Sequence, residues 1–171
     1  MIISKNMTTK EFLLDQFISN HDTNGWFVAL KNTIHNLSAE DAVWKPDGAD
    51  NSIRGILAHL NFYNERYLKR FQGESVGKLD LENSETFAGA ESPSEEDWQA
   101  EIERFDRIMN EWRSEIEAAD ESKFSQAVSK ESQTPWAEVV GLINTHNAHH
   151  GGQIVILRKL QGSWDRSKGV S

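Results

Sequence analysis

Three of the six histidines in this chain stand close together near its C-terminal end, at positions 146, 149 and 150. The segment around them has the apolar spacing of a helix, whose arc is centred on three aliphatic residues: Val139, Ile143 and Leu157. At about 100° per residue, His146 and His150 lie one turn apart and within about 20° of the middle of this arc. Two imidazoles at this spacing can reach one metal ion. The pair therefore predicts a metal site on the inner face of the last helix.

Two more polar residues lie at the flank of the same arc. His149 is about 60 to 80° from its middle, and Gln153 is near the same edge. Both are candidates for contacts to the metal-binding histidines or to a substrate; the alternative is that they are ordinary residues of a helix flank. Four further polar residues are expected to face away from the arc: Asn144, Asn147, Arg158 and Lys159.

A third metal ligand is expected from another helix. His59 lies at the edge of the apolar stripe of a helix predicted over residues 52–72. A histidine at such an edge is more often a boundary residue, and inward histidines are often core residues that hydrogen-bond to a neighbour. An unpaired polar group inside an apolar core costs about 1 to 3 kcal/mol, which a divalent cation removes by taking one nitrogen of each ring. The three residues together, His59, His146 and His150, are the predicted metal ligands.

The elements that must position these residues are helical. Few Val, Ile and Thr alternations occur, and the chain holds only three prolines. Four long amphipathic segments are predicted at residues 8–34 with a break near 22–25, 52–72, 92 to about 116, and 134–160. Thr8 and Ser92 are the expected caps of the first and third segments. The fold class is thus all-α, a four-helix bundle of up-and-down type in one domain spanning 1–171, with its core at about 9–160.

A polar segment at residues 73–91 forms the long connection between the second and third helices. Connections of this length often cross the end of a bundle or cover a site.

Composition excludes several other functions. With no Cys, the chain can form neither a disulfide, a thiolate metal site nor a cysteine nucleophile. Asn147 stands where the His-Glu-x-x-His motif of zinc proteases needs Glu, and no Glu-x-x-His, phosphate-binding glycine loop or Gly-x-Ser-x-Gly elbow occurs. The net charge of −9 argues against nucleic acid as a partner. No apolar run reaches the ~20 residues of a membrane span, and Met1–Met7 does not resemble a signal peptide, so a cytoplasmic protein that does not bind membranes is expected.

Two parts of the sequence resemble the DinB/YfiT-like family of metal-dependent enzymes. They are Leu37–Pro46 followed by Ser52–Leu60, and the histidine motif His146–Ile154. The likeness extends over residues 9–160. It implies a four-helix bundle with one histidine ligand from the second helix and two from the fourth, which are His59, His146 and His150 here. The sequence departs from the family pattern at Gly151, where relatives often carry an arginine. This chain is therefore not expected to hold a substrate through an arginine at that position.

The resemblance also implies a reaction on a small-molecule substrate. Known members include thiol S-transferases and isomerases that use low-molecular-weight thiols such as bacillithiol or mycothiol, and others are regarded as metal-dependent hydrolases. Three neutral histidines leave an open position on the ion, as in catalytic zinc sites. Zinc or nickel is the first expectation, followed by iron or manganese.

Two functional hypotheses follow from these features. The first is a metal-dependent hydrolase or thiol transferase that works as a homodimer, with a low-molecular-weight thiol as co-substrate in the second case. The alternative is a non-catalytic helical bundle with a structural metal or an interaction role.

Overall fold

A computed structural model describes residues 7–89 and 93–170. In these ranges the chain is helical and contains no β-strand, so the all-α prediction is confirmed. The helices are α1 (Thr9–His21), α2 (Leu30–Thr33), α3 (Ala39–Val43), α4 (Ile53–Phe71), α5 (Glu95–Ala118) and α6 (Trp136–Gln161), with 3₁₀ turns η1 (Asn83–Phe87), η2 (Glu121–Ser125) and η3 (Arg166–Lys168). None of the helices in the described ranges has the length and hydropathy needed to cross a bilayer.

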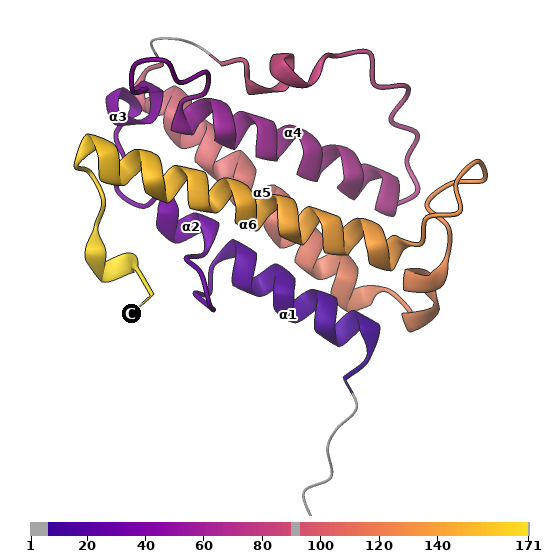
Figure 1. The fold of residues 1–171 in the computed structure, drawn as a ribbon. Helices are drawn as coiled ribbons and strands as arrows, with labels where there is room; N and C mark the ends of the chain where they lie inside the picture. The colour runs from indigo at the N-terminus through magenta and orange to yellow at the C-terminus, as the bar shows by residue number, and fades with distance from the viewer. Residues whose placement is uncertain (1–6, 90–92, 171) are drawn as a thin grey trace, which may run out of the picture.

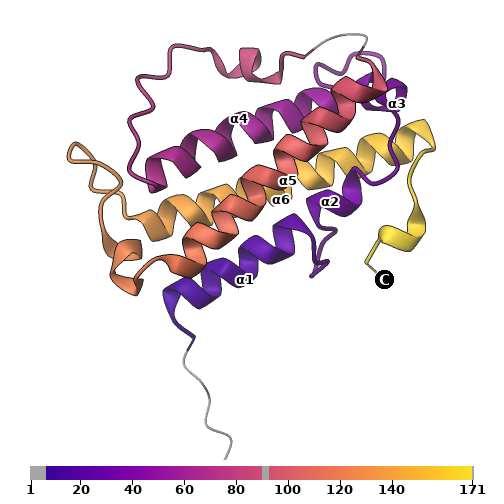
Figure 2. The same ribbon diagram turned by 180° about the vertical axis from the view of Figure 1, so that it is seen from behind.

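The four long helices pack along one another. Helix α4 contacts α5 and α6, and α1 contacts the same two helices from the other side, as Figures 1 and 2 show from opposite directions. Helices α1 and α6 run one way, whereas α4 and α5 both run the other (Figure 1). A strict up-and-down bundle alternates these directions, so the arrangement differs from the sequence-based expectation in this respect.

The connection between α4 and α5 explains the parallel pair. A helix of 19 residues is about 28 Å long. The connection leaves the C-terminal end of α4, runs back along this helix and carries η1 against it (Figure 1). The long connection predicted from the sequence therefore returns the chain to the N-terminal end of α4. It also places a polar segment along α4.

The helix ends follow capping rules. Thr8 caps α1 with the predicted capping box, and Gly162 ends α6 in the left-handed conformation, with φ 82°. The third long helix begins later than predicted, because Ser94 is its N-cap and forms a capping box with Asp97. Ser92, the expected cap, lies outside the described residues. Both serines are followed three residues later by an acidic residue, so the local pattern alone offers two starts.

The inner face of α6 differs from the predicted arc. Asn147 is fully buried and exchanges two hydrogen bonds with Asn64 of α4, at Nδ2–Oδ1 distances of 2.9 and 3.1 Å. Asn144 and Arg158 are buried as well, whereas Lys159 is exposed as expected. A pattern based on hydrophobicity misplaces these residues because it cannot see partners that make a polar group stable in the core. The centre of the buried face therefore lies near Asn147, and His146 stands at its edge.

Candidate metal centre

Helices α4 and α6 bring three imidazoles together. The Nε2 atom of His146 lies 2.9 Å from Nε2 of His59 and 3.2 Å from Nε2 of His150. One ring nitrogen from each of the three lies within 4.8 Å of the other two. His59 and His150 are buried and His146 is half-buried. The structure thus places at one point the three histidines selected from the sequence.

A threonine in the α4–α5 connection orients His59. Nδ1 of His59 lies 2.6 Å from the hydroxyl oxygen of Thr86, and that hydroxyl donates its own proton to the Asn83 carbonyl at 2.6 Å. Because its proton is used, the hydroxyl oxygen can only accept from the ring. His59 therefore carries its proton on Nδ1, which leaves a bare lone pair on Nε2.

The side-chain amide of Gln153 orients His150 in the same way. Nδ1 of His150 lies 2.7 Å from Oε1 of Gln153, an atom that can only accept. The amide nitrogen of Gln153 lies 3.2 Å from Nε2 of His149, which accepts its proton. His150 therefore also presents a bare Nε2. His149 and Gln153 are both exposed, and they form a chain of contacts behind His150 rather than part of the central group.

A close backbone approach puts Thr86 in reach of His59. A Cβ on Gly55 of α4 would lie 2.9 Å from the Phe87 carbonyl oxygen, closer than real Cβ contacts come. Only glycine at this position lets η1 lie so near to α4. The sequence offered no local signal for Thr86, because it lies in a polar connection far from both histidine motifs.

Burial keeps the rings neutral. It lowers the pKa of His59 to about 3, with the charges of His150 and His146 adding to the effect, and it lowers the pKa of His146 to about 4, with His150 and His149 adding. Burial also lowers the pKa of His150, although the hydrogen bond that its Nδ1 donates to Gln153 acts the other way. At neutral pH the three rings are therefore neutral, which is the state in which imidazole binds a metal ion.

The donor set fits a divalent cation. His146 can donate from Nε2 to only one of its two neighbours, so at least one bare lone pair in the group faces another nitrogen without a proton between them. A cation turns this repulsion into coordination. Imidazole nitrogens on one tetrahedral zinc ion, at ~2.0 to 2.1 Å from it, lie about 3.3 Å from each other, close to the two distances of 2.9 and 3.2 Å from Nε2 of His146.

Aromatic rings surround the three histidines. Phe87 stacks on His59 with ring centroids 3.9 Å apart and an angle of 14° between the planes. Tyr63, one turn after His59 on α4, meets the rings of His59 and His146 edge-on, at 4.9 and 5.7 Å. The i, i+4 spacing from His59 is the signal by which Tyr63 could have been found.

Two pockets lie near the histidines. The first, here called the α4–α6 groove, has a volume of about 390 Å³ and reaches His146, with Tyr63 and Tyr67 on its α4 side and Leu142 and Ile143 on its α6 side. A second, polar pocket of about 350 Å³ lies beyond Phe87 and none of the three histidines lines it.

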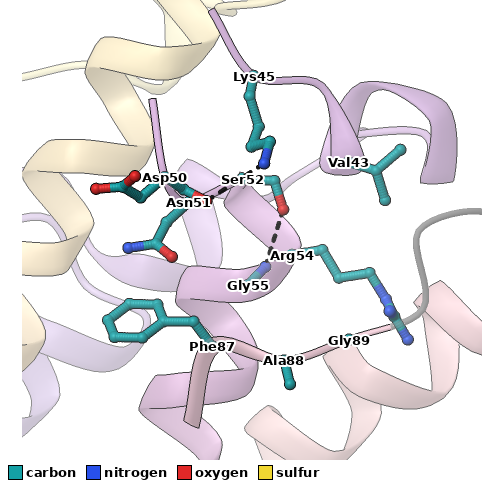
Figure 3. Close-up of a pocket in the computed structure, with 10 residues that line it drawn as sticks. All are labelled: Val43, Lys45, Asp50, Asn51, Ser52, Arg54, Gly55, Phe87, Ala88 and Gly89. Atoms are coloured by element: carbon teal, nitrogen blue, oxygen red, sulfur yellow. Dashed lines mark hydrogen bonds between the residues drawn. The ribbon is translucent and has the colours of Figure 1, made fainter. Parts of the chain in front are cut away.

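Figure 3 shows the polar pocket. Arg54 extends toward Gly89, while the ring of Phe87 points the other way. The Lys45 ammonium lies at its rim, where it donates to the Asp50 carbonyl at 3.4 Å. Phe87 thus stands between this pocket and His59.

The two other histidines with a described environment take no part in the group. His21 is buried on α1, with Nε2 3.2 Å from an Asp106 carboxylate oxygen on α5. His35 is half-buried and follows α2, and its backbone carbonyl accepts from Arg158 at 2.9 Å. Neither residue is part of the three-histidine group.

Comparison with known protein families assigns the chain to one of them. The profile of the DinB superfamily matches residues 28–154, which is more than half of its length. The chain belongs to the DinB superfamily. The comparison with curated proteins gave no match, and neither did the comparison with solved structures. The DinB-matched part contains His59, His146 and His150, so the residues that show membership also include the three-histidine group.

One position in the DinB-matched part limits what the site can hold. Gly151 follows His150 and is buried, and a Cβ there would lie 3.4 Å from Cδ2 of Leu30. A long side chain at this position would have to displace Leu30. At this position the DinB chain therefore offers no side chain that could contact a substrate.

Proposed function

We propose that this chain binds a divalent metal ion through His59, His146 and His150 and uses it in a reaction of a small molecule. The observation that carries the proposal is the convergence of three Nε2 atoms, two of which are bare because Thr86 and Gln153 hold the protons on Nδ1. Zinc or nickel is the first choice of metal, since both accept imidazole, and iron or manganese follows. We also take the four long helices to be a DinB-type four-helix bundle.

The ion would supply Lewis acidity, which can polarise an oxygen of a reactant or stabilise a thiolate. The chain's own residues keep the site ready for it. Thr86 and Gln153 fix the ring orientations, and Phe87 covers one face of His59. Because the chain has no Cys, a thiol for S-transfer has to be a co-substrate, whereas hydrolysis needs only water. Both reactions remain open to this site.

A catalytic site must admit a reactant, and a structural metal need not. His146 is half-buried and lines the α4–α6 groove, so the group can be reached from outside. Structural metal sites are closed by protein ligands on every side. This access favours a reactive metal over a structural one.

Metal analysis of the purified full chain tests the proposal. We expect one equivalent of a divalent ion in the wild type, its loss in His146→Ala with the helical circular dichroism unchanged, and its retention in His35→Ala, which removes a histidine outside the group. No stoichiometric uptake of zinc, nickel, iron or manganese would refute the metal site. Unfolding on removal of the metal would instead support a structural ion.

A further inference from the structure

The walls of the α4–α6 groove are apolar and carry no formal charge. Of the described residues that line it, none is Lys, Arg, Asp or Glu. Its α6 side is aliphatic apart from His146, its α4 side consists of two tyrosine rings, and Asn83 of η1 adds an amide to its wall. The Tyr63 hydroxyl donates its proton to Oδ1 of Asn83 at 3.2 Å, so it too offers no charge. A charged ligand in this groove would lose water without meeting an oppositely charged side chain on the groove wall.

The groove reaches the histidines at His146. His146 forms part of its wall, and the Tyr63 ring touches both His146 and His59. A group bound beside His146 can therefore extend along Tyr63 and Leu142. The volume of about 390 Å³ falls within the usual range for small-molecule sites.

The Arg70 guanidinium packs on the Tyr67 ring, 5.2 Å from its centroid, but Arg70 does not line the groove, and two other cations line the polar pocket instead. Lys45 and Arg54 line that pocket, and Phe87 separates it from His59. An anionic substrate held by these cations would have the Phe87 ring between it and the Nε2 atoms. The geometry thus favours access by an apolar route.

On the basis of the metal site proposed above, we infer that the α4–α6 groove binds the apolar body of an uncharged small-molecule substrate, whose reacting group lies beside His146. The substrate class is therefore a neutral compound with an aromatic or aliphatic part. Leu142 is the residue that sets this preference, because it lines the groove and is 60% exposed.

Three probes test the inference on the full chain loaded with Co²⁺: imidazole, 4-phenylimidazole and 4-(imidazol-4-yl)benzoate, whose carboxylate is too far from the ring nitrogen to chelate the ion. Each offers an imidazole nitrogen to the metal, and binding is measured from the visible absorption of cobalt. We expect the phenyl group to improve affinity by about tenfold or more, since it buries apolar area, and the carboxylate to give no further gain. No gain from the phenyl group, or tighter binding of the benzoate than of 4-phenylimidazole, would overturn the inference.

A pair of exposed residues on α6 supplies the variants. Leu142→Asp puts a charge on the groove wall and should reduce the affinity for 4-phenylimidazole to that for imidazole. Ile156→Asp is the matched control, because Ile156 is 59% exposed on the same helix and does not line the groove. An equal effect of both variants would count against the groove. Leu142→Asn replaces Leu142→Asp if the charge impairs folding, with a smaller loss expected.

A metal-free arm separates this inference from the metal proposal. Saturation-transfer NMR on the apo protein should show magnetisation reaching the phenyl protons of 4-phenylimidazole, and Leu142→Asp should weaken the signal several-fold. If the chain takes up no cobalt, the metal proposal is refuted, but this measurement still shows whether the groove binds the phenyl group. Equal signals in the wild type and Leu142→Asp would reject the groove even where the metal binds.

Discussion

The hydroxyl of Thr86 lies in the middle of a hydrogen-bond chain that begins at Nδ1 of His59 and ends at the Asn83 carbonyl. It accepts from Nδ1 of His59 and donates to the Asn83 carbonyl, each at 2.6 Å. Thr86→Val keeps the shape of the side chain and removes both hydrogen bonds. Because His59 is only 2% exposed, water cannot easily replace the lost partner.

The expected loss is one of metal affinity. Without its acceptor, the His59 ring is free to turn or to move its proton to Nε2, and either change removes a ligand lone pair. Loss of a hydrogen-bond partner behind a ligating histidine commonly costs 10- to 100-fold in metal affinity, which is about 1.4 to 2.7 kcal/mol. That range agrees with the ~1 to 3 kcal/mol for a buried polar group left unpaired.

Thr33→Val is a matched control for this substitution. Thr33 is fully buried, and its hydroxyl donates to the Leu30 carbonyl three residues earlier at 2.7 Å, the same local bond that Thr86 makes to Asn83. It has no histidine partner. Both variants should therefore lose folding stability by about 1 kcal/mol, and only Thr86→Val should weaken the metal.

Competition with a chromophoric chelator at neutral pH measures the zinc affinity, and urea unfolding of the apo proteins measures stability. A Thr86→Val protein that binds zinc as tightly as the wild type would show that the hydroxyl does not orient His59. An equal loss of affinity in Thr33→Val would trace the effect to general destabilisation.

Three further substitutions have definite expected outcomes. Gly152→Ala should stabilise the protein in urea unfolding by about 0.8 to 1 kcal/mol, because Gly152 lies inside α6 and a Cβ there meets no atom within 4 Å. Gly55→Ala should destabilise it and reduce zinc affinity, because the new Cβ pushes the Phe87 backbone, and η1 with it, away from α4. Partial burial raises the pKa of Glu65, but the hydrogen bond and the charge of Arg104 outweigh this effect and lower the pKa overall. The wild type should therefore be more stable than Glu65→Gln at a pH above the unfolded carboxyl pKa of about 4.3. This difference in stability should be below about 1 kcal/mol for a partly exposed pair, and it should vanish as the pH falls through the lowered pKa of Glu65. Acid unfolding curves of both proteins measure it. A difference that stays constant with pH would show that the ion pair is not its source.

Much of the candidate site could be predicted because its parts follow local rules. The one-turn spacing of His146 and His150 fixes their relative direction on any helix, and the periodicity of the second helix places His59 at the edge of its apolar stripe. Resemblance to the DinB family then joined the two motifs. Their meeting in the structure depends on the antiparallel contact of α4 with α6, which the apolar stripes favour but do not define.

The remaining parts depend on contacts between distant segments. Thr86 reaches His59 because the connection returns over α4 and because Gly55 lets it approach, and neither fact is visible in a local pattern. Asn147 was placed outside the core since amide side chains count as polar, yet Asn64 satisfies both of its amide atoms inside. Such pairs are invisible to hydrophobic periodicity, because their burial depends on a partner 83 residues away.

The position of the buried face of α6, which differs from the predicted arc, determines how accessible His146 is. Had His146 been at the centre of the buried face, its ring would have been enclosed by four helices and no reactant could approach it. The buried face is instead centred on Asn147, whose paired amide holds α4 and α6 in register one residue from the histidine. His146 is thereby positioned by the rigid core but faces the α4–α6 groove. A site at the boundary combines the two properties that metal catalysis needs, which are fixed ligands and an open side.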